Sequence, residues 1–384
     1  MSNQSSFVAA GLMSGSSLDG TDYTVVRFTA ESLREPIPAG GRDRNHFEWL
    51  LTDERPYPQS LTLELKSADQ LPHREFLELE YRYSNYLGEM MRDLNESLPA
   101  QSQPTVIGIH GHTVFHEPQK GFSLQMGSGS AIARKTASPV CLDFRNAAIA
   151  AGGEGAPMAP IVDALFTEEY SVFLNLGGIA NLSVFDGHGA LSFDVCACNQ
   201  LLNFFAEKKG QKMDEGGRMA SGGNLNRDLL RHWEETPYLR KYPPKSLSNQ
   251  QVRKWFIDGA DNFSLSAEDG LRSACEHIAV EIQTALKQIL EKSRGHPGKT
   301  ILVSGGGAKN DFLMQCIEEK LNALDMNLKK ADPVLLDFKE ALLMARMAAL
   351  RWGGTPNFVD TKSGEGSAVV GGALYLPPYY KRHG

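Results

Sequence analysis

The feature that most constrains the fold is a strand–glycine turn–strand pattern that occurs twice in the chain. Near the start, the apolar segment Phe7–Met13 runs into a turn of small residues and is followed by a second strand-like segment, Tyr23–Phe28. The pattern recurs where Val172–Leu176 runs into Gly177 and Gly178 before a further apolar segment. Two such openings favour two related lobes, although two ordinary hairpins would give the same signal.

Long segments at helical spacing separate the strand-like segments. Apolar residues three or four positions apart form one stripe of a helix, and such spacing occurs within 271–289 and 341–348. A third stripe consists of Phe76, Leu79, Tyr83, Leu87, Met90 and Leu94. Strands mixed with long helices predict an α/β protein.

The composition excludes several classes of protein. With 41% hydrophobic residues the chain is globular, and a net charge of −7 argues against a nucleic-acid partner. The N-terminus lacks the features of a signal peptide, and no apolar run reaches the length of a membrane span. Five scattered cysteines argue against a disulfide framework, so we expect a cytoplasmic protein. No cluster has the ligand spacing of a zinc site, so no protein-bound metal is expected.

Glycines mark the candidate ligand loops, since 37 glycines among 384 residues exceed the usual share of about 7%. In Gly11–Asp22 the glycines allow close approach of an anion, and the hydroxyls of Ser14, Ser16 and Ser17 could donate to phosphate. Taken alone, however, the Asp-Gly pair favours a hairpin turn. Gly305–Gly307 follow a strand and predict close approach by a planar group such as a nucleotide base.

Three histidines and one arginine are candidates for a polar pocket. His110, His112 and His116 could bind a metal, but without nearby carboxylates we favour pocket or surface roles for His112 and His116. Arg145 follows a strand and could hold a carboxylate or phosphate, or equally form a salt bridge to Asp143.

Asp194 is the candidate general base because it ends an apolar run, where its carboxylate would emerge at a strand tip. The alternative is that it caps the helix expected at Gln200–Glu207.

In this order the segments resemble the anhydro-N-acetylmuramic acid kinases, a family within the sugar kinase, heat-shock 70 and actin superfamily. The resemblance runs from Gly11 to the Gly371-Gly372 region. The motifs that carry it are GLMSGSSLDGTD (11–22), GIHGHTVFHEP (108–118), LQMG (124–127), DFRNAAIAAGGEGAPMAP (143–160), LNLGGIANLS (174–183) and SGGGAKN (304–310).

The resemblance implies two ribonuclease H-like lobes, the actin-like ATPase fold, with the active site in the interlobe cleft. Residues 1–145 with about 365–384 would form the N-terminal lobe, and 146–364 the C-terminal lobe. A first phosphate loop for ATP would comprise Gly15, Ser16, Ser17, Leu18, Asp19, Gly20, Thr21 and Asp22. The second phosphate loop would include Gly177 and Gly178, and the adenosine loop Gly305, Gly306, Gly307 and Asn310.

The resemblance also implies the reaction and its residues. Asp194 would be the catalytic aspartate, and the sugar would contact His112, Thr113, Arg145, Asn181 and Glu340. With ATP and Mg²⁺, the enzyme would hydrolytically open 1,6-anhydro-N-acetylmuramic acid and phosphorylate its O6, in peptidoglycan recycling. A cytoplasmic homodimer is implied. The alternatives are a kinase for another amino sugar and a catalytically weak ATP or sugar sensor of the same fold.

One loop departs from the family pattern. Members commonly carry Asp-Thr-Gly-Pro-Gly-Asn where this chain has Asp194-Val-Cys-Ala-Cys-Asn199. If the glycines adopt left-handed φ, Cys196 and Cys198 are expected to be strained there, with a changed loop path or weaker phosphate binding.

Overall fold

The computed structural model describes residues 6–15, 18, 20–35, 47–186, 190–292, 298–359, 368–378 and 380. Contacts between Cα atoms divide the chain into two compact units, Met1–Leu165 with Phe338–Gly384, and Phe166–Asp337. These boundaries differ from the expected 145/146 and 364/365. Residues 146–165 and most of the helix at Pro333–Gly353 belong to the first unit.

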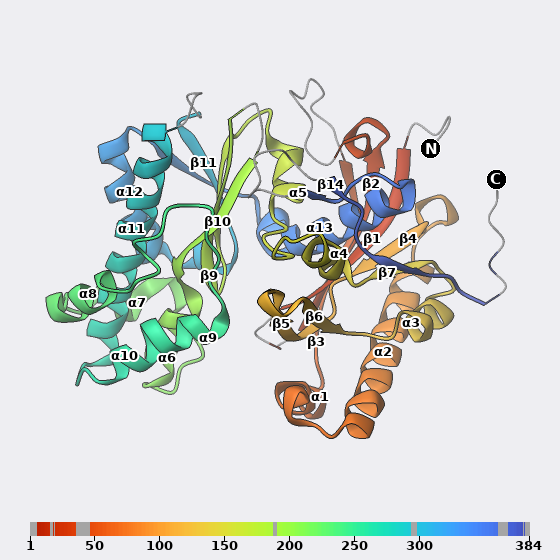
Figure 1. Cartoon of the computed structure of the whole chain (residues 1–384), viewed down its shortest axis with the longest axis horizontal. Helices are drawn as coiled ribbons and strands as arrows, with labels where there is room; N and C mark the ends of the chain where they lie inside the picture. The colour runs from red at the N-terminus through yellow and green to blue at the C-terminus, as the bar shows by residue number, and fades with distance from the viewer. Residues whose placement is uncertain are drawn as a thin grey trace. The chain divides into compact units, whose positions relative to one another are not determined.

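The first unit is built on a six-stranded sheet of order β15-β7-β4-β1-β2-β3 (Figure 1). β1, β2 and β3 run antiparallel in sequence order, whereas β4 and β7 extend the sheet parallel to β1. β15 pairs antiparallel with β7 at the edge. The bounds are β1 Ser6–Ser14, β2 Gly20–Thr29, β3 Phe47–Pro56, β4 Val106–Ile109, β7 Val140–Leu142 and β15 Ala373–Tyr375.

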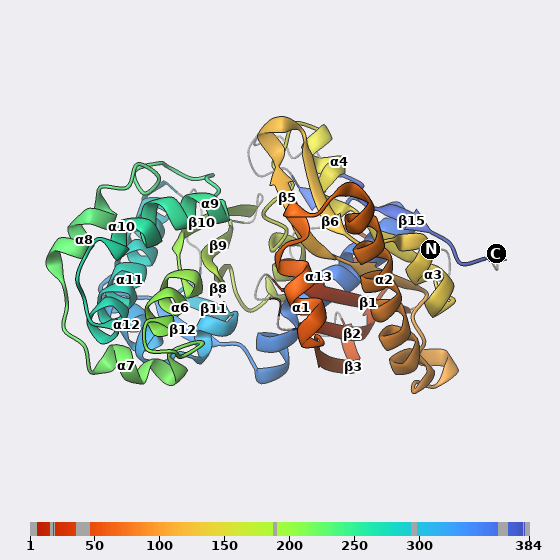
Figure 2. The same cartoon turned by 90° about the horizontal axis from the view of Figure 1, so that it is seen from below.

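Helices α1, α2 and α3 cover one face of this sheet (Figure 2). The stripe predicted from spacing lies on α2 (His73–Glu96), whose Leu79, Tyr83 and Leu87 are buried. Met91 rather than Met90 completes the buried stripe, and Phe76 packs partly buried beside it. The shorter helices of this unit are α1 Gln59–Lys66, α3 Gly129–Thr136, α4 Phe144–Ala150 and α5 Pro160–Asp163.

The opposite face of the sheet carries α13 (Pro333–Gly353), which packs on two glycines. Gly11 on β1 and Gly108 on β4 are direct neighbours in the parallel register. A Cβ on Gly11 would lie 1.9 Å from the carbonyl oxygen of Ala341, and one on Gly108 would lie 2.1 Å from that of Met344. The helix therefore lies directly on the strand backbones, and for this reason most of it belongs to the first unit.

The second unit repeats the strand arrangement of the first. Its five-stranded sheet has the order β10-β9-β8-β11-β12, with three antiparallel strands followed by two strands parallel to the first. The bounds are β8 Val172–Leu176, β9 Ile179–Phe185, β10 Ala190–Ala197, β11 Thr300–Ser304 and β12 Asn327–Lys330. The shared topology confirms the duplicated opening and the α/β fold with two ribonuclease H-like sheets, rather than two unrelated hairpins.

Helices gather on one side of this second sheet, and among them α11 and α12 supply many of the residues of its core (Figure 1). The predicted stripe within 271–289 lies on α11 and is buried. The bounds are α6 Asn199–Glu207, α7 Arg218–Ser221, α8 Arg227–Glu234, α9 Asn249–Val252, α10 Asp258–Asp261, α11 Ala267–Lys292 and α12 Asp311–Leu321.

Two small two-stranded sheets complete the first unit. β5 (His112–Glu117) pairs with β6 (Phe122–Met126), and β13 (Phe358–Val359) pairs with β14 (Ala368–Val369). The apolar residues of Phe122–Met126 are typical of a strand, whereas β5 mixes exposed and half-buried positions and has no apolar run. Within the described part of the chain, no helix combines the length and apolar character that a membrane crossing requires.

Candidate active site

Four polar residues stand side by side across the sheet of the second unit. Ser304 on β11 pairs with Asn175 on β8, and Asn175 pairs with Asn181 on β9. Asn181 in turn pairs with Asp194 on β10. Because directly paired residues share one face of a sheet, these four residues form one polar row. The row brings together Asn181 and Asp194, and it adds Asn175, which the sequence analysis missed.

Asp194 is held by the segment 238–247. Its carboxylate Oδ2 accepts hydrogen bonds from the Leu247 N–H at 2.8 Å and from the Ser246 hydroxyl at 3.4 Å. Its backbone N–H donates to the Lys245 carbonyl at 3.0 Å, and its carbonyl accepts from the Tyr238 hydroxyl at 2.7 Å. A β-bulge follows directly, between Asp194 and Cys196. The carboxylate is therefore fixed in orientation, within the strand rather than at its tip.

Two half-buried charged groups, Lys245 within this segment and Glu281 on α11, lie close to Asp194. Burial lowers the pKa of the Lys245 ammonium, while the charges of Glu281 and Asp194 oppose that effect. Burial raises the pKa of Glu281 to about 7, and Lys245 opposes this rise. The Lys245 ammonium also lies 4.8 Å from the centre of the Tyr238 ring. Asp194 thus lies in a partly desolvated electrostatic environment with a positive charge nearby.

The residues after Asp194 do not adopt the left-handed φ that was expected to strain them. Cys198 has a φ of −129°, and Cys196 does not occur among the described residues with left-handed φ. Both thiols are fully buried, and burial raises the pKa of Cys198 to about 12. Cys198, not Asp194, is the N-cap of α6, so the helix-capping interpretation of Asp194 is wrong.

The two glycine loops of the second unit lie against each other. Gly305 has a φ of +84°, and a Cβ there would lie 2.7 Å from Asn175 Oδ1. A Cβ on Gly307 would lie 2.7 Å from the Cβ of Leu176, which directly precedes the Gly177-Gly178 turn. The close approach predicted for this loop is therefore made by the end of β8. Internal packing alone accounts for Gly305 and Gly307.

The other two residues of the predicted adenosine loop, Gly306 and Asn310, have different surroundings. Gly306 is exposed. Asn310 is buried, and its side-chain Oδ1 accepts from the Leu313 N–H at 2.9 Å, so it caps the start of α12. The Gly177 carbonyl accepts from the N–H of Asn199 at 3.1 Å, which joins the turn to the start of α6.

In the first unit, Arg145 at the start of α4 binds His110. Its Nε and Nη2 lie 3.1 and 2.9 Å from His110 Nε2, and its Nη1 donates to the Gly155 carbonyl at 2.9 Å. Because His110 Nε2 accepts, its Nδ1 carries the proton and donates to the Gly111 carbonyl at 3.0 Å. Burial and the Arg145 charge lower the pKa of His110 to about 3. Asp143 accepts instead from Asn146, at 2.6 Å.

The other two histidines lie on β5. His112 is half-buried, and burial lowers its pKa, whereas the neighbouring Thr113 is exposed. His116 Nδ1 lies 3.0 Å from the Ser123 hydroxyl, and burial lowers its pKa to about 4. His110 and His116 thus have different hydrogen-bond partners, Gly111 with Arg145 and Ser123 respectively. The described ranges contain no group of three side chains able to hold a metal ion.

Glu340 lies on α13, next to a buried ion pair between Lys339 and Asp163. Its side chain keeps contact with solvent, yet protein surrounds it closely enough that burial raises the pKa of its carboxyl. The charges of Lys339 and Arg145 oppose this rise. Arg145 and Glu340, both predicted to contact the sugar, therefore lie within electrostatic reach of each other.

The predicted first phosphate loop connects β1 to β2. Gly15 accepts a hydrogen bond from the Leu18 N–H at 3.2 Å, and Leu18 is buried with a φ of +55°. Gly20, Thr21 and Asp22 begin β2, and a Cβ on Gly20 would lie 2.3 Å from the Arg55 carbonyl oxygen. Ser16, Ser17 and Asp19 lie outside the described residues.

Ser14 does not offer the hydroxyl that the sequence suggested for phosphate. Its side chain is buried, and its Oγ lies 2.7 Å from the Tyr57 hydroxyl and 2.5 Å from the Tyr83 hydroxyl. The hydroxyl therefore points into the core of the first unit.

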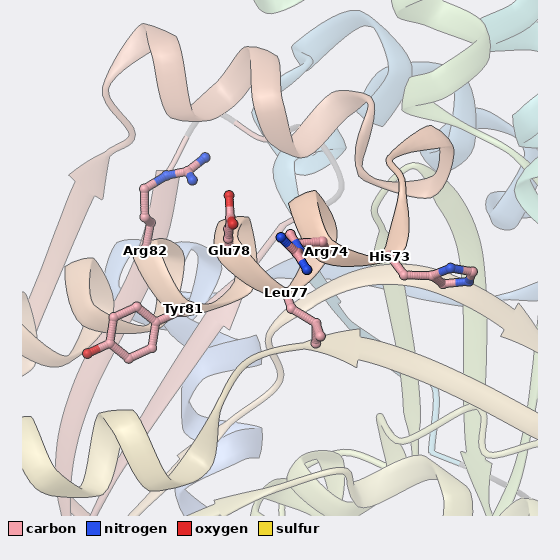
Figure 3. A pocket seen from close by; sticks show the side chains of 6 residues that line it. All are labelled: His73, Arg74, Leu77, Glu78, Tyr81 and Arg82. Carbon is pink, nitrogen blue, oxygen red and sulfur yellow. The ribbon is translucent and has the colours of Figure 1, made fainter.

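An open hollow of about 640 Å³ lies along the first half of α2, and none of its lining residues is among those predicted to bind ligands (Figure 3). All of its lining side chains come from the first three turns of this helix. Two of them, Leu77 and Tyr81, are exposed. The lining consists of His73, Arg74, Leu77, Glu78, Tyr81 and Arg82.

Some residues of the site carried a sequence signal and others did not. Asn175 interrupts an otherwise buried strand, and such a polar position within an apolar run could have been singled out. The segment 238–247 offered no comparable signal, because it is irregular chain and two of its four contacts to Asp194 come from backbone atoms, of Leu247 and Lys245.

Comparisons with known proteins agree with the motifs. The family model for anhydro-N-acetylmuramic acid kinase matches residues 7–377. A protein of that name from Methylorubrum populi is 32% identical, covering 96% of this chain and 99% of the relative. Another from Vibrio vulnificus is 30% identical, covering 95% and 97%. The solved structure of component A of the Acidaminococcus fermentans (R)-2-hydroxyglutaryl-CoA dehydratase aligns at 11% identity with a TM-score of 0.42, covering 89% of this chain and 98% of that one.

Proposed function

The chain belongs to the anhydro-N-acetylmuramic acid kinase family, and from this premise we propose that it phosphorylates 1,6-anhydro-N-acetylmuramic acid with ATP. Family membership makes it a kinase, a phosphotransferase that acts on an alcohol group. In the proposed reaction, water bonds to C1 of the sugar and the C1–O bond of the anhydro bridge breaks. The released O6 takes the γ-phosphoryl group of ATP, giving N-acetylmuramate 6-phosphate and ADP.

The observation that carries the proposal is the fixed carboxylate of Asp194. The attacking water must lose a proton as it bonds to carbon, and a positioned carboxylate can accept that proton. The Leu247 N–H holds Oδ2 at 2.8 Å, so the orientation of the base is set before substrate binds. Asn181, directly paired with Asp194, is the proposed neighbouring contact to the sugar.

The remaining sugar contacts are proposed in the first unit. Arg145 is oriented by His110 and the Gly155 carbonyl, so its guanidinium is preorganised to bind the lactyl carboxylate of the substrate. Glu340 would accept hydrogen bonds from sugar hydroxyl or amide groups, and His112 and Thr113 on β5 would complete the contacts. His110, which stays neutral, acts on the sugar only through Arg145.

Nucleotide binding is proposed at three loops. Gly15–Asp22 would bind the phosphates first, Gly177 and Gly178 would form the second phosphate loop, and Gly305–Gly307 with Asn310 the adenosine loop. Gly306 is the exposed member of the last loop and so the one open to a ligand. We propose that ATP is bound with Mg²⁺, which in kinases is held by phosphates, waters and one or two carboxylates and would neutralise charge on the transferred group.

An assay with the proposed substrates tests this function. The full chain is incubated with Mg-ATP and 1,6-anhydro-N-acetylmuramate, and ADP and the sugar 6-phosphate are measured. Sugar-dependent formation of both is expected in equal amounts. ADP formation with a different amino sugar alone would replace the substrate, and nucleotide binding without turnover would indicate a sensor.

The proposed physiological setting follows from the substrate. A 1,6-anhydro amino sugar is a fragment of peptidoglycan, so we propose recycling of the cell wall in the cytoplasm of a bacterium. We also propose that the enzyme is a homodimer, which light scattering of the purified chain would test.

A further inference from the structure

Three hydroxyl groups meet in the core of the first unit, where β1 ends and the turn to β2 begins. Ser14 is the last residue of β1, Tyr57 follows β3, and Tyr83 lies on α2. The Ser14 Oγ is 2.7 Å from the Tyr57 hydroxyl and 2.5 Å from that of Tyr83, and the two phenol oxygens are 3.1 Å apart. The exposures of the three residues are 4%, 7% and 0%.

These three hydroxyls satisfy one another. Each carries one proton and can accept at least one hydrogen bond, so three mutual contacts close a ring in which every hydroxyl donates once and accepts once. Burial raises the pKa of Tyr57 and of Tyr83 above the ordinary phenol value, so both remain protonated. We call Ser14, Tyr57 and Tyr83 the hydroxyl triad.

The hydroxyl triad fixes the point where the first loop begins. Gly15 follows Ser14 directly, and the Leu18 N–H closes a turn onto the Gly15 carbonyl. Leu18 buries its side chain in the same core, and its carbonyl accepts from the Thr62 hydroxyl on α1 at 3.2 Å. Two helices therefore contact described residues of this segment, α2 through Tyr83 at Ser14 and α1 through Thr62 at Leu18.

We propose that Tyr57 and Tyr83 are positioning residues for nucleotide binding, which act through Ser14 on the Gly15–Asp22 loop. The inference rests on the proposed function, which assigns this loop to the phosphates of ATP. The triad holds Ser14, and with it the Gly15 carbonyl onto which the Leu18 N–H closes, in place before the nucleotide arrives. Loss of one hydroxyl frees the loop and adds an ordering cost to every nucleotide that binds.

Tyr83→Phe tests the proposal, with Tyr23→Phe as its matched control. Tyr23 is equally buried on the same hairpin and donates to Asn95 Oδ1 of α2 at 2.7 Å, but it lies toward the far end of that helix from the loop. Each variant deletes one buried, hydrogen-bonded phenol hydroxyl at the same interface, so both should lower the melting temperature similarly. A purely structural role for Tyr83 predicts nothing further.

The deciding measurement is the affinity of the full chain for Mg-ADP by calorimetry, together with the KM values for ATP and sugar. Tyr83→Phe should weaken ADP binding and raise the KM for ATP by about three- to tenfold, the size of one lost hydrogen bond. Its KM for the sugar should stay within about twofold of wild type, as should both constants of Tyr23→Phe. Equal ADP affinities for the two variants would overturn the proposal.

Ser14→Ala opens the triad from its other side and covers the case in which Tyr83→Phe fails to fold. It should reproduce the loss of ADP affinity, and the Ser14→Ala/Tyr83→Phe double variant should be no weaker than the weaker single one. Additive losses, or a Ser14→Ala variant with wild-type affinity, would overturn the proposal. A wild-type chain that binds ADP but phosphorylates no sugar would overturn the proposed function while leaving this comparison decisive.

Discussion

Lys339 and Asp163 form an ion pair of 2.6 Å in which the two side chains are only 7% and 1% exposed. Asp163 ends α5, just before the first unit gives way to the second, and Lys339 lies on α13, just after the chain returns. The pair therefore links the segment where the chain leaves the first unit to the segment where it returns. It also fixes the turn of α13 that carries Glu340.

Breaking this pair should be costly because a buried charge loses its partner. Lys339→Met should lower the free energy of unfolding by about 3–5 kcal/mol, measured by urea denaturation. The exposed pair between Lys299 and Asp325 provides the control, and Lys299→Met should cost less than about 1 kcal/mol. Equal costs for the two variants would show that burial of the first pair carries no energetic weight.

Gly11 should tolerate no side chain, because its added Cβ meets the backbone of α13 and not a movable side chain. Gly11→Ala should destabilise the chain by at least about 3 kcal/mol or prevent folding, measured as soluble yield and melting temperature. At Gly222 the nearest atom to an added Cβ is 3.7 Å away, so Gly222→Ala should fold normally. A well-folded Gly11→Ala protein would mean that α13 lies farther from the sheet.

Asp194→Asn should remove turnover and keep the fold. The amide retains an oxygen that accepts from the Leu247 N–H but cannot take a proton from water, so kcat should fall about 10²–10⁴-fold while Mg-ADP affinity stays near wild type. Asp261→Asn, on an exposed surface pair with Lys208, is the control. Near-normal turnover of the first variant would remove Asp194 from the role of general base.

His277 should contribute to loss of stability in acid. It is buried between Trp233 and Phe256, its Nε2 has no hydrogen-bond partner among the described residues, and burial lowers its pKa to about 3. The unfolded chain binds this proton near pH 6.5, so stability falls as the pH falls from about 6.5 towards 3, by up to about 1.4 kcal/mol per pH unit.

His277→Phe tests this contribution, because it fills the same space without a titrating group. The free energy of unfolding should depend less steeply on pH than in wild type, as measured by denaturation between about pH 7 and pH 4. His73→Phe, at the exposed start of α2, should keep the wild-type slope. An unchanged slope for His277→Phe would assign the acid sensitivity to other groups.

Both hairpin openings were predictable from the sequence, because each combines an apolar strand with a turn of small residues, but only the fold distinguishes a duplicated topology from two ordinary hairpins. Helical stripes were predictable for the same reason, since burial imposes a periodicity on α2 and α11. The unit boundaries were not predictable. They depend on α13 lying on Gly11 and Gly108, and the sequence does not show that two glycines far apart in the chain are neighbours in one sheet.

The candidate site shows the same limit. Asp194 was found because its residue type and position carry a chemical meaning, but the Leu247 N–H that orients it carries none in the sequence. For Gly305 the glycine run predicted close approach by a planar ligand, whereas the fold brings Asn175 and Leu176 of β8 against it. Ser14 shows the reverse case, a hydroxyl in a ligand-like motif that the fold turns into the core.

The burial of all five cysteines has a practical consequence for spectroscopy. The native thiols are buried, and burial raises the pKa of Cys196 and Cys198, so thiol-labelling reagents should not react with them in the folded chain. One cysteine introduced at an exposed position on each unit could then carry a pair of dyes without a cysteine-free background. Energy transfer between the dyes would then measure, in single molecules, whether nucleotide or sugar changes the distance between the two labelled positions.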